Sequence, residues 1–238
     1  MRPGSLLLVL VVSVGLLLGC TAARHMAKET PPGQVPGPPQ AGDKGRLLAS
    51  YVFSGGVHDQ TGNGHDGRIE GAEVTDKGLV FDGIKSHVDI PASPAFELTD
   101  SIGISARIKR SEVGRTDPIL GKCGGQPGGT GHFEFDVGPD NRLIFAFFVG
   151  HWVRHSSQGT ISDTNRHTIA VTYDRKEVRF FIDGRLDSAF PESARLPANG
   201  SSLQVGEKQS SWPFDYFKGT ISSLQIFGGA VTAAGSEK

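Results

Sequence analysis

Two acidic side chains on one short apolar segment are the first candidates for chemistry. Glu134 and Asp136 alternate with Phe133, Phe135 and Val137, so on a β-strand both carboxylates face the same side. Retaining hydrolysis of a glycosidic bond uses two carboxyl groups about 5–5.5 Å apart. Catalysis by Glu134 and Asp136 is therefore one hypothesis. The other, which we favour, is that they are two surface carboxylates on a strand.

Histidines and acidic loop residues raise the question of a metal site. His151 and His155 on one strand would lie about 13 Å apart at about 3.3 Å per residue, too far to share an ion. The sequence around them has no helical pattern. Asp59, Asn63 and Asp66 could supply oxygen ligands, but the Gly-Asn-Gly between them is equally typical of a turn. We favour the turn, and we predict no metal site and no cofactor.

Aromatic residues with polar neighbours are the stronger indication of a binding site. Trp152 and Arg154 lie on or beside a predicted strand, and Trp212, Asp215 and Tyr216 lie in a Ser-rich stretch before the last one. Sugars bind by stacking on Trp or Tyr rings, while acidic, amide and guanidinium groups hold their hydroxyls. We predict that these five residues form a shallow face that binds a glycan or a protein. The alternative is that Tyr216, together with Phe217, belongs to the core and that Trp212 covers a sheet edge.

The two cysteines, Cys20 and Cys123, are too few for a disulfide scaffold. Cys123 is followed by glycines, and no histidine near it in sequence would activate the thiol. We interpret it as an unpaired loop residue, with a reactive thiol as the alternative. A disulfide between the two cysteines is conceivable if Cys20 is not modified.

The N-terminal segment has the pattern of an export signal. Arg2 precedes an apolar run, residues 6–18, which is too short to span a bilayer as a helix. It ends in Leu17-Leu18-Gly19-Cys20, which resembles the lipobox of bacterial lipoproteins and implies lipidation of Cys20. The alternatives are an ordinary signal peptide cut near Ala22 or Ala23 and an uncleaved anchor. We predict a signal peptide over 1–19 and a lipidated, Pro- and Gly-rich linker over 20–46, since that segment has too few large apolar residues for a core.

The elements that must position these residues read as short β-strands. Apolar residues alternate over 169–173 and 178–182, and Asp183-Gly184 is typical of a tight hairpin turn, so residues 166–189 predict an antiparallel meander. Segments 78–83 and 86–91 are predicted to form another hairpin. Further strands are predicted at 102–108, 118–122, 132–137, 142–149, 201–206 and 218–227. The formal net charge of −1 gives no basic field for nucleic acid or acidic lipid.

The order of the motifs resembles a known family. The segments that carry the resemblance include D-Q-T-G-N-G-H-D-G, G-L-V-F-D-G, I-G-I-S-A-R-I-K, R-H-T-I-A-V-T-Y-D, V-R-F-F-I-D-G-R-L and F-K-G-T-I-S-S-L-Q-I-F. Together they are similar to the laminin-G-like domain of the concanavalin A-like lectin/glucanase superfamily, over residues 47–232, with 233–238 as a tail. The resemblance implies an all-β jelly-roll sandwich of two antiparallel sheets, one of them concave.

The chain departs from that family in three places. Arg166 stands where a Trp usually packs, and Ile221-Ser222-Ser223 replaces an acidic pattern that in relatives can help to hold a structural calcium. We do not expect that calcium site here. Glycanases of the superfamily carry a third acidic residue after the pair equivalent to Glu134 and Asp136, where this chain has Gly138-Pro139.

These observations favour a membrane-anchored, non-catalytic binding module that recognises carbohydrate or an envelope or extracellular protein. A glycoside hydrolase using Glu134 and Asp136 is the first alternative, and a structural assembly domain of the cell envelope is the second. The expected location is the periplasmic or cell-surface face of a bacterial membrane, through a lipid on Cys20.

Overall fold

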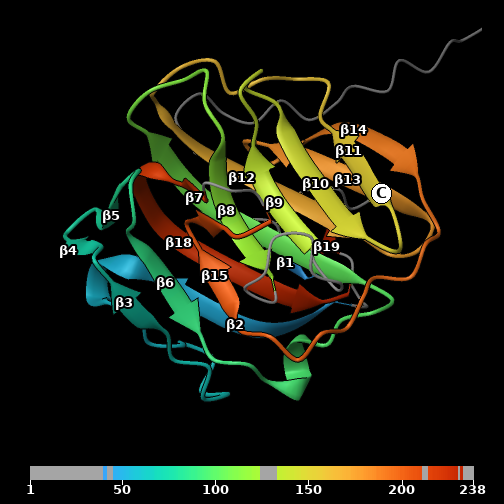
Figure 1. Ribbon diagram of the computed structural model, residues 1–238, viewed down its shortest axis with the longest axis horizontal. Helices are drawn as coiled ribbons and strands as arrows, with labels where there is room; N and C mark the ends of the chain where they lie inside the picture. Colours follow the sequence, from blue (N-terminus) through green and yellow to red (C-terminus); the bar gives the residue numbers. More distant parts are fainter. Residues whose placement is uncertain (1–39, 42–44, 124–132, 211–213, 230, 233–238) are drawn as a thin grey trace, which may run out of the picture. The chain divides into compact units, whose positions relative to one another are not determined.

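Alternating apolar and polar residues build this domain almost entirely from β-strands, stacked in two layers (Figure 1). The computed structural model describes residues 40–41, 45–123, 133–210, 214–229 and 231–232. Within that part of the chain, all pairs of named strands are antiparallel. The prediction of an all-β jelly-roll sandwich is confirmed.

The first sheet has seven strands among the described residues. In spatial order they are β11 (Trp152–Ser156), β10 (Leu143–Phe148), β9 (Phe133–Val137), β8 (Asp117–Lys122), β15 (Leu203–Val205), β6 (His87–Ile90) and β3 (Arg68–Glu70).

The second sheet has eight strands by the same count. Their order is β14 (Arg185–Pro191), β13 (Glu177–Ile182), β12 (Arg166–Tyr173), β7 (Ile102–Arg110), β18 (Lys218–Gly228), β5 (Gly78–Asp82) and β4 (Glu73–Thr75), and β2 (Arg46–Val52) also pairs with β18. Two short pairs and two 3₁₀ turns complete the described elements: β1 (Gln40–Ala41) with β19 (Val231–Thr232), β16 (Glu207–Lys208) with β17 (Asp215–Tyr216), η1 (Phe53–Gly55) and η2 (Pro94–Phe96).

The core lies between the two sheets and is rich in aromatic side chains. Phe135, Phe145 and Phe147 point inward from the first sheet and are fully buried. The rings of Phe145 and Tyr173, which come from opposite sheets, have centroids 6.4 Å apart. Burying one such side chain contributes about 1.5–3 kcal/mol. Because side chains alternate along each strand, Glu134, between two core phenylalanines, faces out of the sandwich.

The predicted meander over 166–189 is present as β12, β13 and β14. Ile182 pairs with Arg185, so Asp183 and Gly184 form a two-residue turn. Their φ angles are 50° and 75°, the left-handed values that this dipeptide tolerates well. This reversal was readable from the residues alone.

The hairpin predicted over 78–91 is wrong. β5 belongs to the eight-stranded sheet and β6 to the seven-stranded one, so the chain changes sheets between them. The Asp82 carboxylate accepts hydrogen bonds from the backbone N–H groups of Ile84, Lys85 and Ser86, which fixes this turn. Turn residues reveal a reversal but not which sheet the next strand joins.

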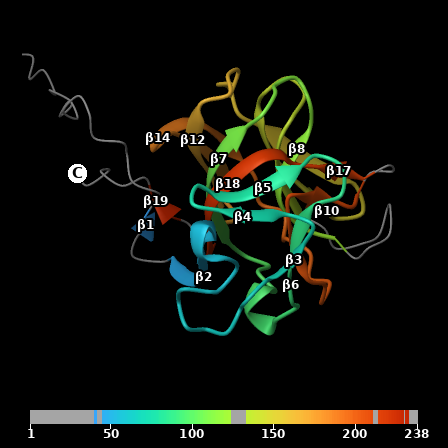
Figure 2. The ribbon, with the colours of Figure 1, turned by 90° about the vertical axis from the view of Figure 1, so that its left-hand side faces the viewer.

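β18 is the central strand of the eight-stranded sheet. It pairs with β7 on one side and with β5 and then β2 on the other. Gly219 on β18 has φ +144°, and a Cβ there would lie 2.2 Å from the Lys109 carbonyl oxygen. The predicted linker also contributes a short strand, because its residues Gln40–Ala41 pair with β19 (Figure 2).

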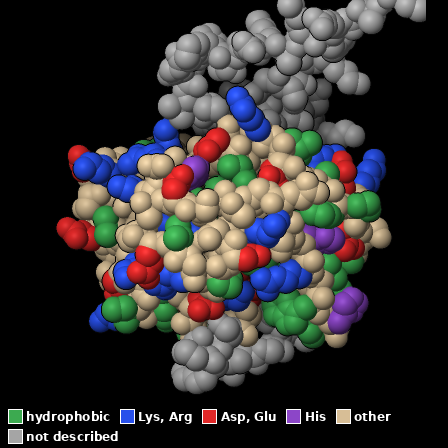
Figure 3. Space-filling view, turned by 90° about the horizontal axis from the view of Figure 1, so that it is seen from above, with side chains coloured by type: hydrophobic (Ala, Val, Ile, Leu, Met, Phe, Trp, Pro, Cys, Tyr) green, Lys and Arg blue, Asp and Glu red, His purple; other side chains and the backbone are tan. Residues whose placement is uncertain are grey.

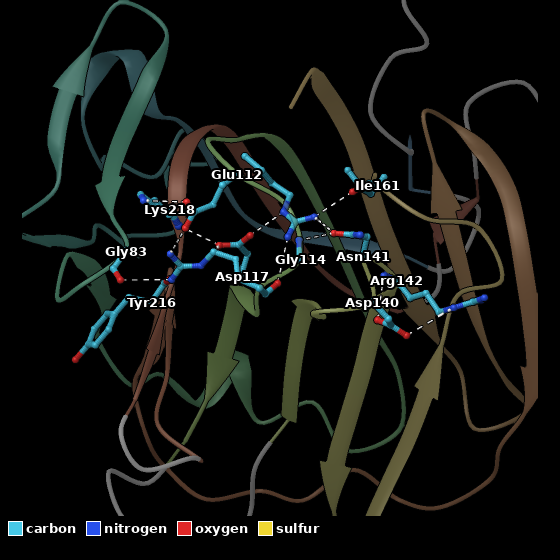
Figure 4. Close-up of polar contacts among 12 residues, drawn as sticks. Gly83, Glu112, Gly114, Asp117, Asp140, Asn141, Arg142, Ile161, Tyr216 and Lys218 are labelled. Atoms are coloured by element: carbon cyan, nitrogen blue, oxygen red, sulfur yellow. Dashed lines mark hydrogen bonds and ion pairs between the residues drawn. The ribbon is translucent and has the colours of Figure 1, made fainter. Parts of the chain in front are cut away.

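The fully buried Arg110 forms hydrogen bonds to several loops at an edge of the sandwich. Arg110 donates from Nε to Asp117 at 2.7 Å and from Nη1 to Asn141 at 2.9 Å and to the Ile161 carbonyl at 3.0 Å. A fourth bond runs from its Nη2 to the Arg115 carbonyl. Figure 4 shows Asp117, Asn141 and Ile161 converging on this point from separate segments. Burial raises the pKa of Asp117, and the Arg110 guanidinium opposes that effect.

Candidate functional site

A pocket of about 200 Å³ opens over the outward face of the seven-stranded sheet. Its lining residues come from β9, β10 and β11 and from the segment that follows β15: Glu134, Ala146, Trp152, Arg154, Lys208 and Ser210. The pocket is smaller than the roughly 300–1,000 Å³ of sites for drug-sized ligands.

Strand register places the floor of this pocket. Glu134 pairs with Ala146, and Ala146 pairs with Arg154, so these three residues form one row across β9, β10 and β11. Neighbouring strands lie about 4.8 Å apart. The short side chain of Ala146 therefore leaves a depression between an acidic and a basic residue.

A lysine neutralises the two carboxylates beneath the pocket. Lys208 Nζ lies 2.8 Å from Glu134 Oε2 and 2.8 Å from Asp136 Oδ2. The side chains of Glu134 and Asp136 are 3% and 1% exposed, and that of Lys208 is 13% exposed. Burial lowers the pKa of Lys208, but the two carboxylates outweigh burial and raise it. Burial and the nearby Glu134 carboxylate together raise the pKa of Asp136 to about 7, against the opposing effect of Lys208.

Our interpretation of Glu134 and Asp136 as surface carboxylates is therefore wrong. Both are buried, because β16 passes over this part of the sheet and brings Lys208 onto them. Asp136 does not line the pocket, whereas Glu134 does. The second carboxylate oxygen of Glu134, Oε1, has no hydrogen-bond partner among the described residues. The arrangement presents one acceptor to the pocket rather than a pair of catalytic carboxyl groups.

Trp152 and Arg154 lie together at this pocket, on the edge strand β11. Trp152 is 43% exposed, and its ring packs edge to face against Phe148 with centroids 5.6 Å apart. Arg154 is exposed as well, and its positive charge acts on Asp136. The structure thus brings two of the five predicted binding residues to one place. Their contact with a ligand stays a prediction.

The other predicted binding residues are placed differently. Asp215 and Tyr216 form β17, which pairs with the strand that carries Lys208, but neither lines the pocket. Burial, together with a hydrogen bond to Glu207, raises the pKa of Tyr216 to about 12. Trp212 lies outside the described residues. Phe217, predicted as a core residue, is fully buried.

His155 and Asp59, two of the residues considered for metal binding, have protein partners. His155 Nε2 lies 3.1 Å from a carboxylate oxygen of Glu192, and its ring stacks on Phe190. The Asp59 carboxylate accepts from the backbone N–H groups of Ser50 and Thr61, as turn chemistry predicts. Among the described residues, no cluster of three or more His, Cys, Asp or Glu side chains could hold a metal ion.

Ser222 stands in the region where relatives can carry an acidic residue that helps to hold a structural calcium. Ser222 donates its hydroxyl to the Lys77 carbonyl at 2.7 Å and offers no carboxylate, so this position does not fit calcium. Cys123 is buried and free, and burial raises the pKa of its thiol to about 12. Cys20 lies outside the described residues. In the part of the chain that the structure describes, no helix is long and apolar enough to cross a membrane.

Sequence reasoning missed Lys208, Ala146 and Ser210. Lys208 lies 72 residues from Asp136 in the chain, and a single lysine before a Ser-rich stretch gives no local indication of a buried ion pair. On the face in Figure 3, basic and acidic side chains are interspersed, so that face carries no field of a single sign.

A family profile matches residues 82–235, and its description is the concanavalin A-like lectin/glucanases superfamily. The chain belongs to this superfamily. Comparison with curated proteins gives no significant sequence match.

Solved structures share the sandwich of this superfamily member at low sequence identity. Domain 4 of AbnA, a GH43 extracellular arabinanase from Geobacillus stearothermophilus, in complex with arabinotriose, matches with a TM-score of 0.65 and 19% identity, over 81% of this chain and 97% of that one. The CBM40 of Ruminococcus gnavus IT-sialidase, bound to α2,3-sialyllactose, matches with 0.54 and 15%, over 65% and 92%. The binding domain of botulinum neurotoxin DC, in complex with rat synaptotagmin II, matches with 0.60 and 14%, over 77% of this chain and 48% of the toxin domain. This chain thus spans about half of the toxin domain, and these likenesses show the fold.

Proposed function

We propose that this domain is a non-catalytic carbohydrate-binding module whose ligand site is the pocket beside Trp152. The observation that carries the proposal is the combination of an exposed Trp152 ring, a buried carboxylate oxygen and a guanidinium around one small depression. An aromatic face with a few convergent polar groups is the usual composition of a sugar site. Two similar structures were determined with arabinotriose and with α2,3-sialyllactose, which supports the same class of ligand here.

The environment of Asp136 supports a non-catalytic role. Retaining hydrolysis needs two carboxyl groups that both reach the substrate. Asp136 is 1% exposed and is held by Lys208, so a sugar in the pocket meets only Glu134. Only one of these two carboxyl groups therefore reaches a glycosidic bond in the pocket, so they cannot act there as nucleophile and acid together.

The test is binding of the full chain to an array of polysaccharides, with Trp152→Ala and a matched control. Leu186→Ala removes another exposed apolar side chain, 57% exposed, from the other sheet. Loss of ring contact should weaken binding by about tenfold or more, which corresponds to about 1.4 kcal/mol, in Trp152→Ala and not in Leu186→Ala. Binding that is unchanged in Trp152→Ala, or no binding to any polysaccharide, would contradict the proposal. Release of reducing ends from a bound polysaccharide would refute its non-catalytic part.

A protein ligand is the second candidate, because a similar toxin domain was determined with synaptotagmin II. The chemistry of the pocket favours sugar, since a flat apolar face is absent from its lining, which holds three charged side chains among six residues. Specific capture of an envelope protein that is lost in Trp152→Ala, with no polysaccharide bound, would favour the protein ligand.

We propose further that a lipid on Cys20 and the segment over 20–46 display the domain at a bacterial membrane. The support is the sequence Leu17-Leu18-Gly19-Cys20 after an apolar run of signal-peptide length. Metabolic labelling with a palmitate analogue should mark the wild-type chain and not Cys20→Ser, and the variant should leave the membrane fraction. Equal labelling of both chains would refute the lipid anchor.

A further inference from the structure

We propose that Glu134 is the hydrogen-bond acceptor of the pocket, and that the pocket selects an electrically neutral sugar residue over its acidic counterpart. This inference rests on the proposed carbohydrate-binding function and adds the class of sugar. It is carried by the contacts of Glu134, by the balance of charges around it and by the spacing of the row to which it belongs.

In the described part of the chain, the Glu134 carboxylate has one oxygen with a partner and one without. Its Oε2 lies 2.8 Å from Lys208 Nζ, while its Oε1 is buried and has no hydrogen-bond partner among the described residues. A buried polar atom without a partner costs about 1–3 kcal/mol, and more when it is charged. Glu134 lines the pocket, so a ligand there can supply the missing donor. An ionised carboxylate only accepts, hence the ligand group must be an O–H or an N–H.

The charged groups around the pocket are two carboxylates and two cations. Two carboxylates, Glu134 and Asp136, are matched by two cations, Lys208 and Arg154, so the charges of these four groups sum to zero once the pH is above the pKa of Asp136, about 7. Lys208 is already engaged by both carboxylates. No net positive charge remains to attract an anion, and the unpartnered oxygen of Glu134 would repel the carboxylate of a uronic or sialic acid.

The acceptor Glu134 and the donor Arg154 lie on either side of Ala146 in one row across the sheet. Glu134 and Arg154 are separated by the single strand β10, so their backbones lie about 10 Å apart. Ala146 leaves the space between them open, and Trp152 borders it. A sugar ring over Ala146 can donate one hydroxyl to Glu134 and accept at another from the Arg154 guanidinium. A ligand with hydroxyls that both donate and accept fits these two groups better than an anion or a cation does.

Calorimetric titration of the full chain at pH 8 tests the inference, since Asp136 is then largely ionised and the charges balance. The neutral probes are the methyl glycosides of arabinose, galactose and glucose. The charged probes are galacturonate, glucuronate, N-acetylneuraminate and glucosamine. At least one neutral sugar should bind about tenfold or more tightly than its uronate, which corresponds to about 1.4 kcal/mol.

Glu134→Gln is the decisive variant, because it keeps the shape and removes the charge. It should weaken neutral sugars about tenfold and reduce the discrimination against uronates, a change of selectivity that general damage to the fold would not produce. Glu70→Gln, on the far edge strand β3 of the same sheet, should bind as wild type. If Glu134→Gln does not fold, Arg154→Met removes the donor from an exposed position and should weaken neutral sugars by a similar factor.

The outcomes separate the two proposals. A uronate that binds as tightly as its neutral parent, or a Glu134→Gln variant with unchanged affinity and selectivity, overturns the role of Glu134 and leaves the carbohydrate-binding function standing. Absence of binding by every sugar, together with polysaccharide binding that Trp152→Ala does not affect, overturns the function itself.

Discussion

Replacing Lys208 by methionine should destabilise the domain in a pH-dependent way. The substitution keeps an unbranched side chain but removes the charge between two carboxylates that are 3% and 1% exposed. Removing one partner of a buried ion pair costs about 3–5 kcal/mol, because the remaining charge stays buried without compensation. A domain of ordinary stability, about 5–15 kcal/mol, loses a large part of its margin by such a change.

The sign of the pH dependence follows from Asp136. Burial raises its pKa from the usual 3.8 to about 7, so between those values the folded state holds a proton that the unfolded state has released. The free energy of unfolding therefore falls as the pH rises through this window. Without Lys208, which opposes the shift, the pKa of Asp136 rises further and the fall continues to higher pH. The cost of Lys208→Met should thus be larger at pH 8 than at pH 5, where Asp136 is protonated with or without Lys208.

Urea unfolding followed by circular dichroism at pH 5 and pH 8 measures both values. Lys176→Met, at an exposed position in the loop between β12 and β13, is the control for loss of a lysine. The double variant Lys208→Met with Asp136→Asn should recover most of the loss at pH 8, since only one buried carboxylate remains. A loss below about 1 kcal/mol at pH 8, the range of surface ion pairs, or equal losses at both pH values would refute the reasoning.

Two further predictions concern backbone geometry and thiol reactivity. Gly219→Ala should lower the melting temperature far more than Gly114→Ala. Both glycines have positive φ, but only at Gly219 would a Cβ meet backbone, 2.2 Å from the Lys109 carbonyl oxygen. Similar shifts of the melting temperature in the two variants would contradict this close approach. Cys123 is 4% exposed and the pKa of its thiol is raised by burial to about 12, so a thiol reagent such as DTNB should label it only after denaturation. Rapid labelling of the native chain at pH 8 would contradict the burial.

Local patterns were sufficient for the longer strands but not for their pairing partners. Alternation over 169–173 and 178–182 and the turn at Asp183-Gly184 specify a meander, because each depends only on neighbours in the chain. The passage from β5 to β6 was mistaken for a hairpin, since Asp82 builds the same kind of turn whether the chain stays in a sheet or crosses to the other. Membership of a sheet is decided by long-range packing.

The candidate site was predictable only in part, for the same reason. Trp152 and Arg154 stand on one strand, and their types alone indicated a binding face. The burial of Glu134 depends on Lys208, which comes from β16, a short strand that the sequence did not reveal. A charge partner 72 residues away from Asp136 leaves no mark in the periodicity of either segment.

The position of β18 has a consequence for how a newly made chain acquires its shape. β2, β5 and β7 all pair with β18, yet its residues, Lys218–Gly228, follow all three of them in the chain. Until that strand leaves the ribosome, the nascent chain holds three strands without their shared partner, and such open edges invite aggregation. Assembly of the eight-stranded sheet therefore waits until β18 has been made, and a chain truncated before residue 218 would lack the strand that β2, β5 and β7 share.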